Sequence, residues 1–477
     1  MNLQNSLSDM FQGMPFFIPE LLMLSWILII TLFELFIRKA DEKSQSNYRF
    51  FIAYLGIFFT LIFSFQRSEL NYYGPLGKNL FLLSPDYYQF SSLIIGGGIL
   101  LLIFTQLIKK NLLFEELISF WTILMGGLFT ACSAHWLTAL LSIETMTLGT
   151  YGLIAIQKTK MSYRALIPYL FLGLTMTAIL IYGISLIYGF TGTLEILGNE
   201  FSRGFGNNRI IGTIGISMVG LAFLFKMAIV PAHPWVPEVI ETLPAQWMTL
   251  LTTIPKLAIG FLGIRILQNL HLPYLEALII LTILTMALGN FGALRQRNTK
   301  RLLAYSSIAH GGFMAMVWIN PSLEAYDLLF FYGMVYFLAS LLGFFLLDRP
   351  QKDYQENDLS EYAGLGTENW SYGLLVVIAM IGLIGFPPAP SIWAKISYFS
   401  FIWNFYTENG NPLIMILFII SILFTAISVF YYLRIPYQLF LKKSDGKNRQ
   451  LIPVKNQQFI FWILAILFLG IFLFPKI

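Results

Sequence analysis

The chain consists of long apolar stretches separated by short polar connections. Fourteen stretches can each form a membrane-crossing helix, which needs about 20 apolar residues. The predicted helices cover residues 15–37, 49–66, 90–108, 113–131, 134–157, 164–190, 208–231, 243–267, 274–294, 301–320, 325–347, 370–400, 411–438 and 456–475. Pro231 lies in the seventh helix and Pro387-Pro388 in the twelfth. Because proline cannot donate the helical amide hydrogen bond, we expect both helices to be broken. The pattern predicts an all-α polytopic membrane protein.

The positively charged residues divide the connections into two classes. Most of the 30 Lys and Arg residues lie in every second connection, beginning with the one between the first two helices. Cytoplasmic connections are rich in Lys and Arg, so we place both termini on the opposite, periplasmic side. Four basic residues lie inside predicted helices instead, at least four residues from either end: Lys226, Lys256, Lys395 and Arg434.

The two proline breaks indicate an internal repeat. They lie five helices apart, and each has a lysine nearby, Lys226 or Lys395. Units of an odd number of helices have opposite orientations in the membrane, so we expect two inverted five-helix repeats. The predicted division is three N-terminal helices in 1–110, the first repeat in 111–272, the second repeat in 273–442 and a C-terminal helix in 443–477.

Composition narrows the classes of function. The chain of 477 residues is 57% hydrophobic and 12% charged, against about 25% charged residues in soluble domains. The net charge of +5 comes from short connections, so it indicates topology and not nucleic-acid binding. A single cysteine, Cys132, excludes an internal disulfide and a cysteine-ligated iron–sulfur or zinc site. No spacing indicates a metal site or a nucleotide-binding loop.

Charged residues within the helices are the candidates for function, because a lysine at the centre of a bilayer costs roughly 2.5–3.5 kcal/mol. Glu144 lies in the middle of the fifth helix and is the predicted partner of Lys226. In such a pair, the attraction between the carboxylate and the ammonium changes when a proton arrives or leaves. The alternative is a static buried ion pair. Lys256 and Lys395 extend the set, with snorkelling to the surface as the alternative. Snorkelling is the favoured interpretation for Arg434.

Two histidines complete the candidates. His310 lies midway along the tenth helix. Because an unperturbed histidine side chain titrates near neutral pH, a histidine here can bridge lysines in a relay; alternatively it is a hydrogen-bonded packing residue. His233 lies at the break of the seventh helix and can respond to Lys226 or satisfy carbonyls that the break frees. The predicted proton relay is therefore Glu144, Lys226, Lys256, His310 and Lys395, with His233 and Arg434 as secondary members.

Several segments resemble the antiporter-like membrane subunits of respiratory complex I. The similar segments are 182–189, 225–226 followed by 231–238, 289–310, 385–388 with Lys395, and 431–434. The resemblance as a whole runs from about Glu144 to Arg434. Lys395 resembles the N- and L-type members, because M-type members have glutamate there. L-type members continue into a lateral helix, whereas this sequence stops at Ile477. The chain therefore most resembles the N-type.

The resemblance implies a function. The chain is expected to be a translocase subunit of a bacterial NADH:quinone oxidoreductase in the cell inner membrane. It would move protons from Lys226 or Lys256 past His310 to Lys395, with Glu144 modulating Lys226. Flavin, iron–sulfur clusters and quinone are expected in partner subunits and no cofactor in this chain. Its expected neighbours are an M-type subunit, the small K- and J-type subunits and membrane lipids.

One departure and three alternatives accompany this interpretation. Pro168 stands where the family usually has a lysine, and Arg164 can carry that charge one turn earlier. The family motifs also occur in multisubunit cation/proton antiporters and in membrane-bound hydrogenases. The third alternative is a structural membrane-arm subunit without its own proton path. That alternative predicts that alanine at positions 226, 256 and 395 leaves pumping intact.

Overall fold

The computed structural model describes residues 13–37, 41–69, 74–77, 79–108, 111–198, 209–268, 270, 274–348, 358–443 and 458–473. The α-helices are α2 (Ile18–Ile37), α3 (Glu42–Glu69), α4 (Pro85–Ile108), α5 (Phe114–Cys132), α6 (Trp136–Ile156), α7 (Lys160–Thr191), α9 (Arg209–Met227), α10 (Trp235–Thr242), α11 (Ala245–Gln268), α12 (Leu275–Arg295), α13 (Thr299–Ala315), α14 (Leu323–Leu347), α15 (Leu365–Glu368), α16 (Trp370–Ile384), α17 (Ser391–Asn409), α18 (Pro412–Leu441) and α19 (Gln458–Phe472). Short 3-10 helices are η1 (Met14–Phe17), η2 (Met316–Trp318) and η3 (Leu359–Tyr362).

Helices account for nearly the whole described chain. Eleven of the described helices are long and apolar enough to cross a membrane. Each of the fourteen predicted helices corresponds to one of the helices above or to a broken pair. The predicted all-α polytopic membrane class is therefore confirmed. The sequence pattern missed one feature, a small antiparallel hairpin of β1 (Gly74–Leu76) and β2 (Phe81–Leu83), in which Pro75 lies opposite Leu82.

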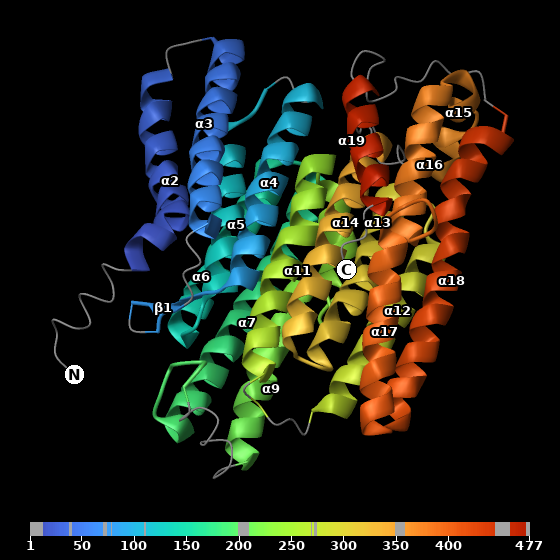
Figure 1. Ribbon diagram of the computed structural model, residues 1–477. Helices are drawn as coiled ribbons and strands as arrows, with labels where there is room; N and C mark the ends of the chain where they lie inside the picture. Colours follow the sequence, from blue (N-terminus) through green and yellow to red (C-terminus); the bar gives the residue numbers. More distant parts are fainter. Residues whose placement is uncertain are drawn as a thin grey trace. The chain divides into compact units, whose positions relative to one another are not determined.

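The chain packs as two compact units. The first unit comprises residues 1–227 and 254–272, and the second comprises 228–253 and 273–477. In the first unit, α2, α3, α4 and α5 pack against one another, α5 packs on α6, and α7 packs on α9 (Figure 1). In the second unit, α12 packs on α13, and α14, α16, α17 and α18 lie side by side (Figure 1). The domain boundaries predicted from the repeats stay predictions.

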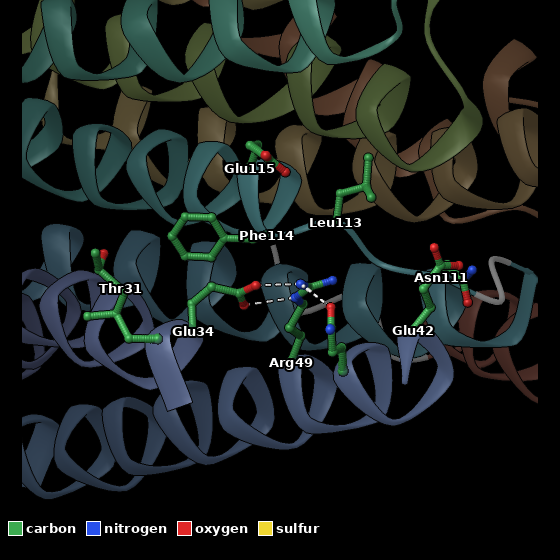
Figure 2. Close-up of a pocket in the computed structure, with 10 residues that line it drawn as sticks. Thr31, Glu34, Glu42, Arg49, Asn111, Leu113, Phe114 and Glu115 are labelled. Atoms are coloured by element: carbon green, nitrogen blue, oxygen red, sulfur yellow. Dashed lines mark hydrogen bonds and ion pairs between the residues drawn. The ribbon is translucent and has the colours of Figure 1, made fainter. Parts of the chain in front are cut away.

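An ion pair fixes the N-terminal helices of the first unit. Arg49 on α3 donates from Nε to Oε2 of Glu34 on α2 at 2.9 Å, and from Nη1 to the Leu112 carbonyl at 2.9 Å. Figure 2 shows the bonded pair on the wall of a pocket of about 380 Å³, which Phe114 also lines. The charge pattern groups Arg49 with the first connection, because it stands at the first position of the predicted helix 49–66. It lies inside a helix instead, because α3 begins at Glu42.

Both predicted helix breaks are present. In the first break, α9 ends at Met227, the Val230–Pro231 peptide is cis, and α10 starts at Trp235. In the second break, α16 ends at Ile384, Pro387–Pro388 is cis, and α17 starts at Ser391. The second break begins with Gly385 at φ +79°, a left-handed conformation that favours glycine. Each break therefore leaves backbone carbonyls without their helical hydrogen-bond donor, at two positions within apolar segments.

A group of four charged residues joins helix ends in the second unit, and we call it the charged clasp: Glu241, Lys300, Arg301 and Asp348. Lys300 Nζ lies 2.9 Å from Asp348 Oδ1, and Arg301 Nη1 lies 2.8 Å from Glu241 Oε2. Lys300 also donates to the Leu243 carbonyl at 2.9 Å. Asp348 Oδ2 accepts from the Ala245 amide at 2.7 Å, which satisfies an otherwise free amide at the start of α11. The charge pattern groups Lys300 and Arg301 with the connection before the predicted helix 301–320, but both lie in the first turn of α13.

Candidate functional site

The first unit holds Lys226 in the last turn of α9. Its side chain is buried, with 8% of its surface exposed. Nζ donates a hydrogen bond to Thr147 Oγ1 on α6 at 2.5 Å. Nζ also lies 5.5 Å from the centre of the Phe225 ring, a cation–π distance. The lysine is thus held by a hydroxyl and an aromatic face.

Glu144 lies on α6 one turn before Thr147 and is half-buried. Its Oε1 accepts a hydrogen bond from Thr177 Oγ1 on α7 at 2.7 Å. Glu144 and Lys226 are both in the described part of the chain, and no ion pair joins them. The structure therefore brings the predicted partners onto neighbouring helices, with a threonine holding each of them.

Aromatic side chains enclose this cluster. Tyr169 on α7 stacks on Phe225 with ring centres 5.7 Å apart, and Tyr151 on α6 meets Tyr169 edge-on at 5.3 Å. The helix α7 continues through Pro168, which is exposed, as is Arg164. No contact among the described residues joins Arg164 to this cluster. The idea that Arg164 replaces the missing lysine stays a prediction.

Two further basic residues lie on the part of α11 that belongs to the first unit. Lys256 follows Pro255 and is 2% exposed, so it is buried rather than snorkelling. Arg265 is also 2% exposed. Its Nη1 donates to the Ser133 carbonyl at 2.8 Å, and its guanidinium lies 5.6 Å from the Phe261 ring centre. The charge pattern groups Arg265 with a connection because it stands near the end of the predicted helix 243–267, but α11 extends to Gln268 and buries the residue.

The second unit holds His310 on α13, with 7% of its surface exposed. Its Nδ1 is hydrogen-bonded to Tyr332 Oη at 2.7 Å, and its Nε2 to Tyr432 Oη at 3.2 Å. Tyr432 Oη is bonded in turn to Ser306 Oγ at 2.5 Å. The sequence analysis missed Tyr332. The available signal was a pair of tyrosines, Tyr332 and Tyr336, one helical turn apart within an apolar helix.

Lys395 on α17 completes the second unit's cluster. It is 4% exposed, and its Nζ donates to the Ile384 carbonyl at 2.7 Å. Ile384 is the last residue of α16, so the lysine satisfies a carbonyl that the helix break frees. Nζ lies 5.0 Å from the centre of the Phe313 ring. A side chain at Gly385 would come within 2.9 Å of Lys395 Cδ, so glycine is needed for this approach.

His310 and Lys395 line the same two small cavities. Each cavity has a volume of about 10 Å³, which is close to the smallest space that holds one water molecule. The buried Asn290 Oδ1 lies along the first cavity and Ser391 Oγ along the second, and neither atom has a hydrogen-bond partner in the described protein. Polar atoms without protein partners favour water in such a space. The cavities therefore suit bridging waters between the imidazole and the amine.

The secondary candidates contact a helix end or lie at a helix break. Arg434 on α18 donates from Nη1 to the Leu294 carbonyl at 2.9 Å, in the last turn of α12. His233 lies between α9 and α10, within the second unit, and its Nδ1 is buried. Its response to Lys226 stays a prediction. His271 lies outside the described residues. Within the described residues, no group of His, Cys, Asp and Glu is arranged to hold a metal ion.

Comparisons with known proteins place the chain in a family. Residues 133–427 match the family described as NADH:quinone oxidoreductase/Mrp antiporter, TM. NADH-quinone oxidoreductase subunit N 1 of Thermodesulfovibrio yellowstonii is 31% identical over 433 residues, covering 89% of this chain and 90% of the relative. NADH-quinone oxidoreductase subunit N of Ruthia magnifica is 27% identical over 473 residues, covering 96% and 95%.

Solved structures show the same fold. A chain of respiratory complex I from Thermus thermophilus superposes with a TM-score of 0.80 at 24% identity, covering 96% of this chain and 98% of the other. A chain of the Mrp complex from Dietzia gives a TM-score of 0.77 at 14% identity, covering 96% and 94%. The family match extends from just before α6 into α18, and so it includes both clusters of buried charges. The chain belongs to the family of transmembrane subunits shared by NADH:quinone oxidoreductases and Mrp antiporters.

Proposed function

We propose that this chain is the N-type (subunit 2) proton-translocating subunit in the membrane arm of a bacterial NADH:quinone oxidoreductase. One observation carries the proposal: titratable residues are buried inside apolar helices, next to two helix breaks, in both units. Buried charge of this kind is expensive in a membrane and marks ion and proton paths. The assignment to this enzyme follows the relatives, because the two described above are named as subunit N of an NADH-quinone oxidoreductase.

The proposed path uses lysines as proton carriers and His310 as the link. A proton enters from the cytoplasmic side and reaches Lys226 or Lys256, passes His310 and leaves from Lys395. Neutral imidazole accepts a proton at one nitrogen and releases another from the other nitrogen. His310 suits this step because both nitrogens are bonded to tyrosine hydroxyls. Glu144 acts on Lys226 through its charge, since a carboxylate beside an ammonium favours the charged forms of both.

The redox chemistry is assigned to other subunits. In this proposal the flavin, the iron–sulfur clusters and the quinone belong to partners, and this chain contributes only proton transfer. The expected neighbours are an M-type antiporter-like subunit, the small K- and J-type subunits and membrane lipids. We place the chain in the cell inner membrane with both termini on the periplasmic side, from the distribution of Lys and Arg.

Co-purification tests the assembly directly. A tagged copy of the chain, isolated from its own membranes in mild detergent, is expected to bring NADH dehydrogenase activity and the peripheral arm with it. An unrelated tagged polytopic protein from the same membranes serves as the control. Isolation without NADH dehydrogenase activity, and in company with the subunits of another complex, would contradict the proposal.

A multisubunit cation/proton antiporter is the second candidate, because the family model covers Mrp antiporters and a chain of an Mrp complex shares the fold. Membrane-bound hydrogenases remain the other alternative relative. An antiporter subunit would support cation-driven proton movement in vesicles without NADH. If the subunit is purely structural, alanine substitutions at Lys226, Lys256 and Lys395 would leave proton pumping unchanged.

We predict that Tyr332→Phe slows pumping while the chain still assembles. The change removes only the hydroxyl bonded to His310 Nδ1. A hydrogen bond of this kind contributes about 0.5–1.5 kcal/mol, so we expect the rate of pumping to fall about two- to tenfold. Proton uptake by inverted membrane vesicles during NADH oxidation is the measurement. Tyr326→Phe, on the same helix, is the control, and equal pumping in both variants would remove Tyr332 from the relay.

A further inference from the structure

Lys226 has two possible acceptors on one face of α6. Glu144 and Thr147 are three residues apart on that helix, and side chains at this spacing lie on the same face. In the structure the ammonium donates to Thr147 Oγ1 at 2.5 Å and not to the carboxylate. The lysine side chain is long and has four rotatable bonds, so it can exchange one acceptor for the other without movement of the helix.

The hydrogen bonds of Thr147 orient its oxygen toward Lys226. Thr147 is 1% exposed, and its hydroxyl donates to the Ile143 carbonyl at 2.7 Å. A hydroxyl has one hydrogen and two lone pairs. Because the hydrogen is directed to Ile143, the lone pairs remain for the ammonium. Thr147 is therefore held in place as an acceptor for Lys226.

Thr177 has one hydrogen and two acceptors. Its Oγ1 lies 2.7 Å from Glu144 Oε1 and 3.1 Å from the Gly173 carbonyl. The bond to a carboxylate is the stronger of the two while Glu144 is charged and in place. If Glu144 turns away, the hydroxyl can rotate to Gly173 and remain satisfied. Thr177 can thus release the carboxylate without leaving its half-buried hydroxyl unpaired.

We propose that Thr147 and Thr177 are positioning residues that hold Lys226 and Glu144 apart, and that their release allows the two charges to pair. In the open arrangement, which the structure shows, each charge is bonded to a threonine. In the closed arrangement, Lys226 leaves Thr147 for Glu144 while Thr177 turns to Gly173. The inference deepens the proposed function and rests on it, because it assigns the control of the Lys226 step to two hydroxyls.

Valine substitutions test the two hydroxyls, since valine keeps the shape of threonine and removes its oxygen. The measurement is made on the assembled complex in inverted vesicles. Thr147→Val and Thr177→Val are each expected to lower the number of protons pumped per NADH oxidised by about tenfold. This factor corresponds to the smallest free energy that a hydrogen bond to a charged group contributes. The serine variants at both positions restore the hydroxyl and are expected to pump normally. Thr145→Val on α6 and Thr175→Val on α7 are matched controls, because each of these hydroxyls donates only to the carbonyl four residues earlier.

The outcomes separate the inference from the proposed function. Normal pumping by both valine variants, or equal losses in the valine and serine variants, would overturn the role of the hydroxyls. If Lys226→Ala also pumps normally, the proposed function fails as well. If Thr147→Val does not assemble, the comparison of Thr177→Val with Thr177→Ser decides the question alone.

Discussion

Replacing Lys226 with alanine is expected to stop coupled proton pumping while the subunit remains folded and assembled. The side chain is buried and bonded to a hydroxyl, so in the proposed path its loss removes a proton carrier and not a structural ion pair. Groups that transfer protons accelerate such steps by about 10²–10⁴-fold, and we expect a loss of at least the lower value. Proton uptake by inverted vesicles, normalised to the amount of assembled complex, is the measurement.

The control for Lys226→Ala is Lys160→Ala. Lys160 begins α7 and is exposed, so its charge is solvated. Both variants remove one positive charge, and only one of them removes a buried charge. Unchanged pumping by Lys226→Ala with normal assembly would favour a structural role for the subunit.

The second large effect is expected at the charged clasp, where Asp348→Ala should prevent stable assembly. The change leaves the Lys300 ammonium buried, with 5% of that residue exposed, and it frees the Ala245 amide at the start of α11. Removing one partner of a buried ion pair costs about 3–5 kcal/mol. The amount of subunit in purified complex, followed during heating in detergent, is the measurement.

Two variants make the clasp experiment specific. Asp327→Ala, on the same helix but exposed, is expected to leave stability unchanged. The double variant Lys300→Met with Asp348→Leu removes both charges and is expected to recover much of the lost stability, because apolar residues often replace a buried pair at little cost. If Asp348→Ala is as stable as Asp327→Ala, the clasp does not stabilise the helix ends.

The sequence predicted the helices and both breaks because these depend on local chemistry. Apolar length fixes a membrane helix, and the prolines at 231 and 387–388 end hydrogen-bonded runs wherever they stand. The burial of Lys226, Lys256 and Lys395 could also be predicted, because long apolar sequence flanks each of them. The sequence pattern was therefore sufficient for features that depend on residues adjacent in the chain: helix length, helix breaks and the burial of these lysines.

The remainder depends on partners that are distant in the sequence. Arg265 stands near the end of an apolar stretch, where only the fold decides between solvent and the Ser133 carbonyl. Glu20 is 0% exposed and accepts a hydrogen bond from Tyr87, a partner 67 positions further along the chain that the sequence around Glu20 does not reveal. The same reason explains why Glu144 was assigned to Lys226 directly. Glu144 instead accepts a hydrogen bond from Thr177 on α7, an uncharged residue that a pattern of charges cannot reveal.

The bond from Lys395 to the end of α16 has a consequence for the working cycle. An ammonium has three N–H groups, and the neutral amine that remains after proton release still has two. The Ile384 carbonyl can therefore keep its donor whether the lysine is loaded or empty. In the proposed path, the last carbonyl of α16 therefore keeps its hydrogen-bond donor while a proton arrives at Lys395 and leaves it, and the helix break needs no change of backbone to accommodate either state.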